Sequence, residues 1–162
     1  MDLKKQIFKL LEEEEKERFI NKKNQQRFEQ QCSHFCNGVM KPVFKNIQQA
    51  FMSYRRSVDI SPSFFSCVRP GVYPKLCISV PNGRMFRYWV EVKQIRDKFC
   101  VKRFRSIEEE GGVPKVFKTS LPHGRQPVDD LSEITEEYLQ RDIIELYRRH
   151  IIISTIPLRH VE

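Results

Sequence analysis

The stretch KLCISVPNGRMFRYWVEVK, residues 75–93, decides the fold. Apolar and polar residues alternate on both sides of Pro81-Asn82-Gly83, which is the two-residue period of a half-buried strand. A two-residue Asn82-Gly83 turn would pair Ile78 with Arg87 and put the two apolar sets on opposite faces. A three-residue loop pairs Ile78 with Phe86 instead. Because a one-residue slip flips every side chain, we predict the three-residue loop, with glycine at the left-handed position of a bulge.

A second hairpin follows the first. A two-residue turn at Arg96-Asp97 pairs Val92 with Val101 and Gln94 with Phe99. The inner face of the predicted sheet is then apolar, with Leu76, Ile78, Val80, Phe86, Tyr88, Val90, Val92, Phe99 and Val101. The outer face is basic and mixed, with Lys75, Cys77, Ser79, Arg87, Trp89, Glu91, Lys93, Lys98, Cys100, Lys102 and Phe104.

The ends of this meander are less regular. Arg103 and Arg105 have the inner register, and we expect them at the frayed end of their strand. Further strands are expected over 58–68 and, after a turn at Gly111-Gly112, over 115–121.

Helical patterns flank the strands. Apolar residues recur at helical spacing from Leu3 to Val39, and a break is expected near Asn37-Gly38 because glycine often follows a helix end. A second helix is expected from Pro42 to about Arg56.

An amphipathic helix is expected from Leu131 to His150, with Asp129 and Asp130 as candidates for its start. Residues 151–153 would leave it as a final strand or a docking tail.

This order predicts an α+β fold: an N-terminal helical arm or helix pair, an antiparallel meander of four to five strands, and a C-terminal amphipathic helix packed on the sheet. Residues 1–57 form the helical part and residues 58–162 the sheet with its helix, together one structural domain with an extension.

Composition narrows the class of protein. The chain has 162 residues, 40% hydrophobic with twelve phenylalanines, enough for a buried core. No apolar run approaches a membrane span, and residues 1–11 lack the continuous apolar region of a secretory signal. Five cysteines, an odd number, argue against a disulfide framework. We therefore expect a cytoplasmic protein.

The net charge of +8 is unevenly distributed. Residues 58–105 carry ten basic and three acidic side chains, whereas residues 106–162 carry seven basic and eleven acidic ones. The positive excess thus concentrates on the predicted sheet. Such asymmetry suits an anionic partner or pairing between subunits.

Residues capable of chemistry are scattered. Cys32 and Cys36 share a helix face, but His34 points elsewhere, and a structural zinc site needs a second ligand pair that is lacking. His123 lies in a loop, where a histidine is more often a solvated surface residue than a catalyst. We expect no catalytic residue, no metal, no cofactor, no small-molecule substrate, and no enzyme.

Two surfaces are candidates for binding. The basic sheet face could bind phosphates and stack bases, or be covered by a helix or another subunit, or simply be solvated. Its candidate residues are Lys75, Arg87, Trp89, Lys93, Lys98, Lys102 and Phe104.

The N-terminal helix is too polar to be stable alone. It is expected either to form a coiled-coil arm that dimerises or grips a larger partner, or to fold back as a helical hairpin. Its candidate interface residues are Leu3, Ile7, Leu10, Leu11, Phe19 and Phe28. Insertion at a membrane surface is disfavoured because Glu12–Glu15 would repel anionic lipid.

The expected function is therefore that of a non-enzymatic cytosolic subunit or adaptor, which assembles with itself or with a larger protein through its N-terminal helix and sheet. The alternative is a nucleic-acid-binding module that uses the basic, aromatic-containing sheet face.

Overall fold

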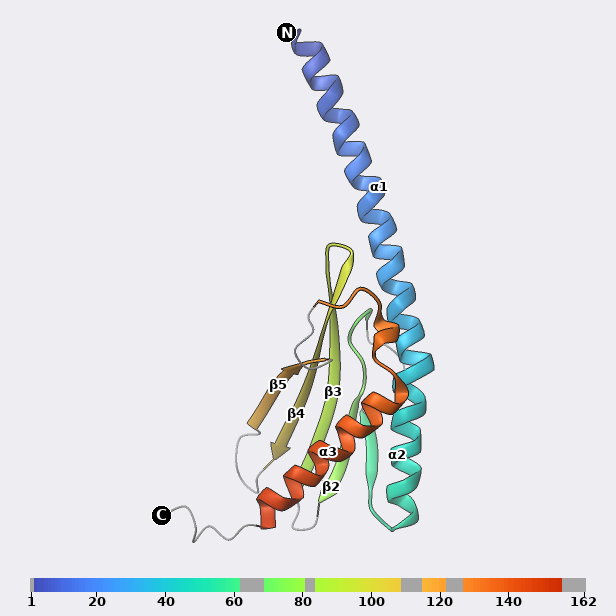
Figure 1. Cartoon of the computed structure of the whole chain (residues 1–162), viewed down its shortest axis with the longest axis vertical. Coiled ribbons are helices and arrows are strands. Elements are labelled where there is room, and N and C mark those ends of the chain that lie inside the picture. Colours follow the sequence, from blue (N-terminus) through green and yellow to red (C-terminus); the bar gives the residue numbers. More distant parts are fainter. Residues whose placement is uncertain (1, 62–68, 81–83, 109–114, 122–126, 156–162) are drawn as a thin grey trace, which may run out of the picture.

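The computed structural model describes residues 2–61, 69–80, 84–108, 115–121 and 127–155. Helices α1 (Leu3–Phe35) and α2 (Lys41–Ser53) are joined by a π-helical turn, Cys36–Met40, and helix α3 (Glu136–Thr155) follows a 3₁₀ turn, Leu131–Glu133. The strands are β1 (Val58–Ser61), β2 (Lys75–Val80), β3 (Arg84–Ile95), β4 (Lys98–Glu108) and β5 (Lys115–Ser120). The predicted α+β fold is confirmed (Figure 1).

The sheet is an antiparallel meander in the order β1-β2-β3-β4-β5. Ile78 pairs with Phe86, Val92 with Val101 and Gln94 with Phe99, so both predicted registers are confirmed. The turn residues 81–83 and 111–112, and the expected continuation of the first strand over 62–68, lie outside the described residues.

The predicted break at Asn37-Gly38 is wrong. The π-helical turn leads directly from α1 into α2, and Lys41 has helical backbone angles (φ −61°, ψ −49°). The turn buries Cys36 and Met40 while Asn37 and Gly38 face solvent. The weak helix propensity of glycine, about 1 kcal/mol below alanine, is outweighed by the core contacts on either side of it. Helix α2 then ends at Ser53, before the expected Arg56.

The C-terminal helix begins later than predicted. Asp130 caps the 3₁₀ turn, where its side chain accepts a hydrogen bond from Ser132 N (2.8 Å). Ile134 then has extended backbone (φ −97°, ψ 101°) and is fully buried, which separates the turn from α3. The helix continues through residues 151–153, so the expected final strand or docking tail does not begin there.

Helices α2 and α3 pack on the inner, apolar face of the sheet. Phe44 of α2 contacts Tyr88 edge-to-face, with ring centroids 6.4 Å apart. Tyr147 of α3 contacts Phe86 in the same way at 5.6 Å. These contacts join three elements distant in sequence into one core.

A buried ion pair ties β4 to α3. Arg103 does not lie at a frayed end, because β4 remains paired with β3 up to Glu108. The Arg103 guanidinium donates to Asp142 Oδ1 (2.6 Å), and the Tyr88 hydroxyl donates to Asp142 Oδ2 (2.7 Å). Burial, and then the Asp142 carboxylate, raise the pKa of Tyr88 well above its ordinary value.

Gly71 is required where the chain approaches β3. It has φ +85°, and an added Cβ would lie 2.2 Å from the Val92 carbonyl oxygen.

We predict that Gly71→Ala destabilises the protein by at least about 2 kcal/mol, since left-handed strain of about 1–2 kcal/mol adds to the displacement of Val92. Gly38→Ala, at a helical position with nothing within 4 Å, is the control and should not destabilise in urea unfolding. Equal losses for both variants would contradict this account.

His150 is a buried base in the core. It is 1% exposed, and neither ring nitrogen has a hydrogen-bond partner among the described residues. Burial, followed by the charges of Arg84 and Arg105, lowers its pKa below 6.5.

We predict that the free energy of unfolding falls as the pH drops below about 6.5, because the unfolded chain binds a proton there that folded His150 does not. His150→Leu should be at least as stable as the parent and should lose this part of the pH dependence. Urea unfolding at several pH values between 5 and 8 would measure it. An unchanged slope in His150→Leu would contradict the assignment.

Candidate functional site

The first half of α1 is a helical arm that extends away from the rest of the molecule (Figure 1). Its seven large apolar side chains are 48–66% exposed: Leu3, Ile7, Phe8, Leu10, Leu11, Phe19 and Ile20. Since α1 is one helix of 33 residues, the folded-back hairpin is wrong. This arm, residues 3–20, is the first candidate site.

Leu3, Ile7 and Leu10 form an apolar stripe of the arm near the face by which α1 docks on the body, whereas Phe8, Phe19 and Ile20 project from other sides of the helix. Leu10 lies 18 and 25 residues before Phe28 and Phe35, which is about five and seven helical turns, so it has the same face as these two residues of the core. Between them this face carries Glu14 and Asn21. The stripe is therefore divided into a docked part at the root of α1, residues 24–35, and an exposed part near its N-terminus.

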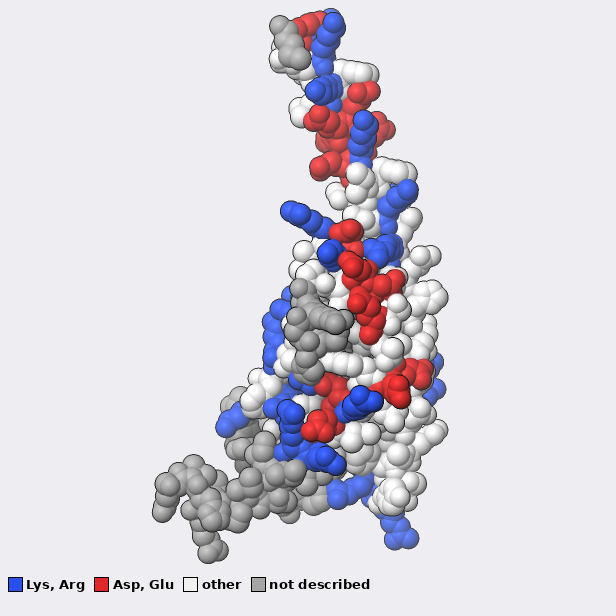
Figure 2. Space-filling view, in the orientation of Figure 1, with Lys and Arg blue, Asp and Glu red and all other residues white. Residues whose placement is uncertain are grey.

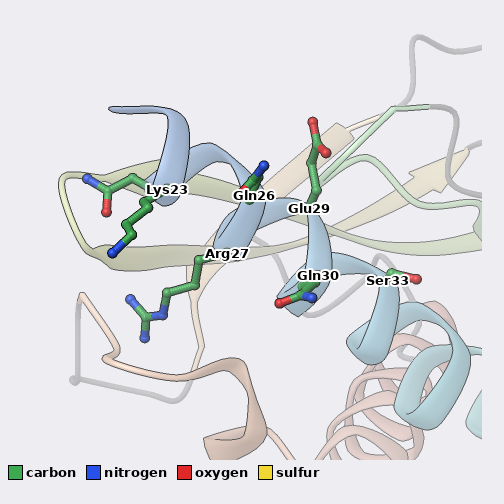
Figure 3. A pocket seen from close by; sticks show the side chains of 7 residues that line it. Lys23, Gln26, Arg27, Glu29, Gln30 and Ser33 are labelled. Atoms are coloured by element: carbon green, nitrogen blue, oxygen red, sulfur yellow. The ribbon is translucent and has the colours of Figure 1, made fainter. Parts of the chain in front are cut away.

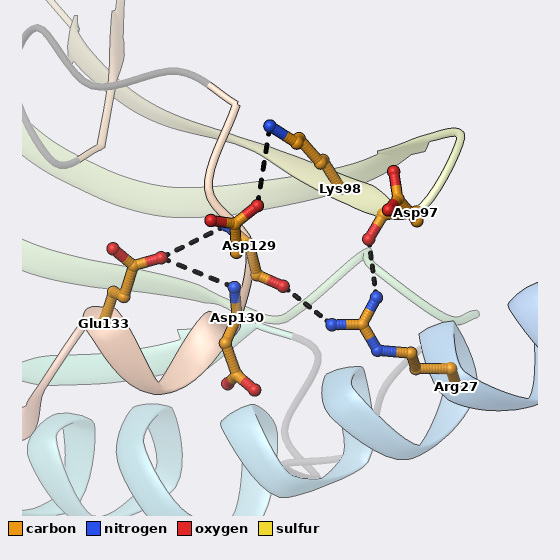
Figure 4. Close-up of polar contacts among 6 residues, drawn as sticks. All are labelled: Arg27, Asp97, Lys98, Asp129, Asp130 and Glu133. Atoms are coloured by element: carbon orange, nitrogen blue, oxygen red, sulfur yellow. Dashed lines mark hydrogen bonds and ion pairs between the residues drawn. The ribbon is translucent and has the colours of Figure 1, made fainter.

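Polar contacts hold the root of α1 against two loops (Figure 4). The Arg27 guanidinium donates to the carbonyl oxygens of Asp97 and, at 2.8 Å, of Asp129. Gln31 is bidentate: its amide donates to Asp130 (3.2 Å) and its oxygen accepts from Leu131 N (3.1 Å). These contacts fix the direction in which the arm leaves the body.

Phe28 belongs to this root. Its ring stacks on Phe99 of β4, with centroids 6.2 Å apart, and Arg27 lies 5.1 Å from the same Phe99 ring. Of the six predicted interface residues, Leu3, Ile7, Leu10, Leu11 and Phe19 lie on the exposed arm, whereas Phe28 is engaged within the molecule.

The second candidate is the outer face of the sheet, opposite α2 and α3. Trp89 and Phe104 are paired residues on β3 and β4, and their rings are nearly parallel at 5.3 Å. Lys75 Nζ lies 4.3 Å from the Trp89 ring centroid, and Lys118 Nζ lies 5.8 Å from that of Phe104. These four side chains form a row across strands β2 to β5, with a lysine at each end and the two aromatic rings between them.

Further basic residues surround this row. The interaction with the neighbouring Lys102 ammonium lowers the pKa of Lys118, and the positive charge of Lys93 adds to the effect. Arg87 lies two residues before Trp89 on the same face of β3, where it pairs with Cys77 of β2 and Ser106 of β4. Lys98 lies at the hairpin between β3 and β4, away from this row, and its Nζ forms an ion pair with Asp129 Oδ1 at 3.6 Å (Figure 4).

Sequence reasoning missed Lys118 on this face and Arg27 and Gln31 at the root of α1. Continuing the alternation into β5 would have placed Lys118 beside Phe104. No local pattern marks Arg27 or Gln31, because their partners lie 70 to 102 residues away.

Sites for chemistry are not evident in the part of the chain that the structure describes. Within it no cluster of three or more His, Cys, Asp or Glu side chains could hold a metal ion. Cys32 and Cys36 are buried in the helix packing, whereas His34 is exposed. His123 lies outside the described residues.

A hollow of about 710 Å³ lies beside α1 and is lined by polar side chains, including Lys23, Gln26, Arg27 and Gln30 (Figure 3). All of its lining residues come from one helix. With no opposite wall, it cannot enclose a small molecule as a substrate pocket would. None of the described helices is both long and apolar enough to cross a bilayer.

Gln31→Ala should destabilise the protein by about 1–3 kcal/mol, because it removes two hydrogen bonds and leaves the part-buried Leu131 N–H without its acceptor. Gln30→Ala, the same change at the exposed neighbouring residue, is the matched control and should cost far less. Urea unfolding of both variants measures the difference. Equal effects would show that the Gln31 contacts do not hold α1 to the body.

Comparison with known proteins adds no assignment to these surfaces. No protein-family model matches this chain, and neither a curated protein nor a solved structure matches it.

Proposed function

We propose that the protein is a non-enzymatic assembly subunit whose arm pairs in antiparallel orientation with the arm of a second copy. The observation that carries this proposal is the exposure of seven large apolar side chains along residues 3–20. Most of the stability of a helix in a protein comes from packing of its apolar residues rather than from helix propensity. Burial of the stripe against another helix would supply the missing stability.

The charges of the arm favour a second copy as the partner. Residues 3–11 contain Lys4, Lys5 and Lys9 and no acid, whereas residues 12–17 contain five glutamates and one lysine. Figure 2 shows the glutamates as a red band partway along the arm, with blue lysines between the band and the N-terminus. The arm therefore carries both halves of a complementary pair.

Orientation follows from this order of charges. In a parallel pair, the lysine segments would face each other and so would the glutamate segments, which is repulsive. In an antiparallel overlap over residues 3–20, the lysine segment of each copy lies along the glutamate segment of the other. Leu3 then lies near Phe19 and Ile20 of the second copy. The overlap is about 27 Å long and spans residues 3–20 of both copies.

The proposal predicts a charge-exchange result. Lys4→Glu/Lys5→Glu/Lys9→Glu makes an acidic arm, and Glu13→Lys/Glu14→Lys/Glu15→Lys makes a basic one. Each variant alone should be monomeric because its arms repel, and a mixture of the two should form a one-to-one dimer. Light scattering coupled to size-exclusion chromatography would measure the masses, with the parent protein expected to be dimeric at tens of micromolar.

Ile7→Asp with Leu10→Asp should give a monomer with an unchanged near-ultraviolet dichroism spectrum, since these residues do not touch the body. Gln6→Asp with Lys16→Asp, at arm positions off the central stripe, is the control and should weaken the dimer much less. A monomeric parent, or mixed charge variants that stay apart, would overturn antiparallel self-assembly. Loss of the dimer only when the sheet is altered would place the interface elsewhere.

A further inference from the structure

We infer that the outer face of the sheet binds single-stranded nucleic acid, with phosphates beside its lysines and bases on the Trp89–Phe104 pair. This inference is independent of the arm, because α2 and α3 pack on the opposite face of the sheet and the arm extends away from it. Protein assembly and nucleic-acid binding can therefore be tested separately.

Charge favours a polyanionic partner. By strand register the outer face has six basic residues and three acidic ones: Lys75, Arg87, Lys93, Lys98, Lys102 and Lys118, against Asp59, Glu91 and Glu108. Lys102 and Lys118 lie close enough to depress protonation of one of them, with Lys93 contributing and Glu91 opposing. A phosphate beside these ammonium groups would relieve their repulsion and release counterions.

The aromatic pair favours unpaired bases over a duplex. Trp89 and Phe104 are half-buried, and their rings are nearly parallel. The exposed Lys75 and Lys118 lie over the Trp89 and Phe104 rings, respectively. An exposed cation–π contact is weaker than base–aromatic stacking. A base can therefore displace the Lys75 ammonium from Trp89 while the lysine swings to the adjoining phosphate. Bases inside a duplex are already stacked and cannot reach these rings.

The dimensions of the row suit a short single strand. Lys75 and Lys118 are separated by three strand spacings, about 14 Å. Aromatic residues on a sheet face can stack two or three bases. Lys93 and Lys102, which flank the row on β3 and β4, would contact the phosphates on one side of it.

Trp89 makes a direct assay available because it is the sole tryptophan of the chain. Titration of the full-length protein with 12-nucleotide oligothymidine and oligouridine at 50 mM salt should quench its fluorescence. The affinity should fall steeply at 200 mM salt, with a logarithmic slope of about −2 to −3 if three or four phosphates are neutralised. A duplex of the same length should bind far more weakly.

Variants locate the site. Lys102→Glu with Lys118→Glu should reduce the affinity at least roughly tenfold. Because Lys118 is exposed and Lys102 half-buried, the circular dichroism spectrum of this variant should be compared with that of the parent. Lys22→Glu with Lys45→Glu changes the net charge equally at exposed positions of α1 and α2 and should have a much smaller effect. Trp89→Ala, followed by anisotropy of a labelled oligonucleotide, should weaken binding roughly ten- to hundredfold.

Three results would overturn the inference: no quenching at low salt, equal loss in the charge-matched control, or equal binding of a polyglutamate peptide. The last would identify an acidic protein segment as the ligand. The oligonucleotide should still quench the Trp89 fluorescence of the monomeric Ile7→Asp/Leu10→Asp variant. Failure of the assembly proposal and failure of the nucleic-acid proposal are therefore distinguishable.

Discussion

The pairing of Ile78 with Phe86 is the constraint on which the rest of the structure depends. In a meander this register propagates strand by strand, so one pairing decides which side chains face the helices and which face away. Here it places an apolar surface under α2 and α3, and a row of lysines and aromatic rings on the other side. A shift of one residue would expose the core and bury the charges. The core and the candidate nucleic-acid face are thus two consequences of one alternation.

The arm depends on a different constraint, which is the rigidity of its root. Residues 3–20 contribute no side chain to the described core, and the direction of the arm comes from residues 24–35. There Phe28 stacks on Phe99, the Gln94 amide donates to Asn24 O (2.9 Å), and Arg27 spans two loops. The π-helical turn extends the same rod into α2, which packs on the sheet. A helix so anchored at one end presents its free end in a defined orientation, which favours pairing over random collapse.

The two proposed surfaces have opposite electrostatic designs. The arm carries separate blocks of opposite sign, which suits a second copy of the same helix in antiparallel orientation. The sheet face carries mostly one sign around flat rings, which suits a polyanion with flat bases. A dimer joined through antiparallel arms would hold two such faces far apart and raise the effective concentration of each for a long strand. Assembly and binding would then reinforce each other without sharing residues.

Much of the fold was determined by the sequence alone, because its signals were local. Alternation and turn length predicted two strand registers, and helical spacing predicted the helices flanking the sheet. The failed predictions were those in which distant contacts compete with local propensity. Gly38 does not end a helix because Cys36 and Met40 are buried, and Arg103 is not frayed because Asp142 pairs with it from α3. Only the tertiary structure separated Phe28 from the exposed arm, paired Lys98 with Asp129 and joined Arg27 and Gln31 to their loop partners. Each depends on a partner far along the chain, and no local pattern encodes that distance.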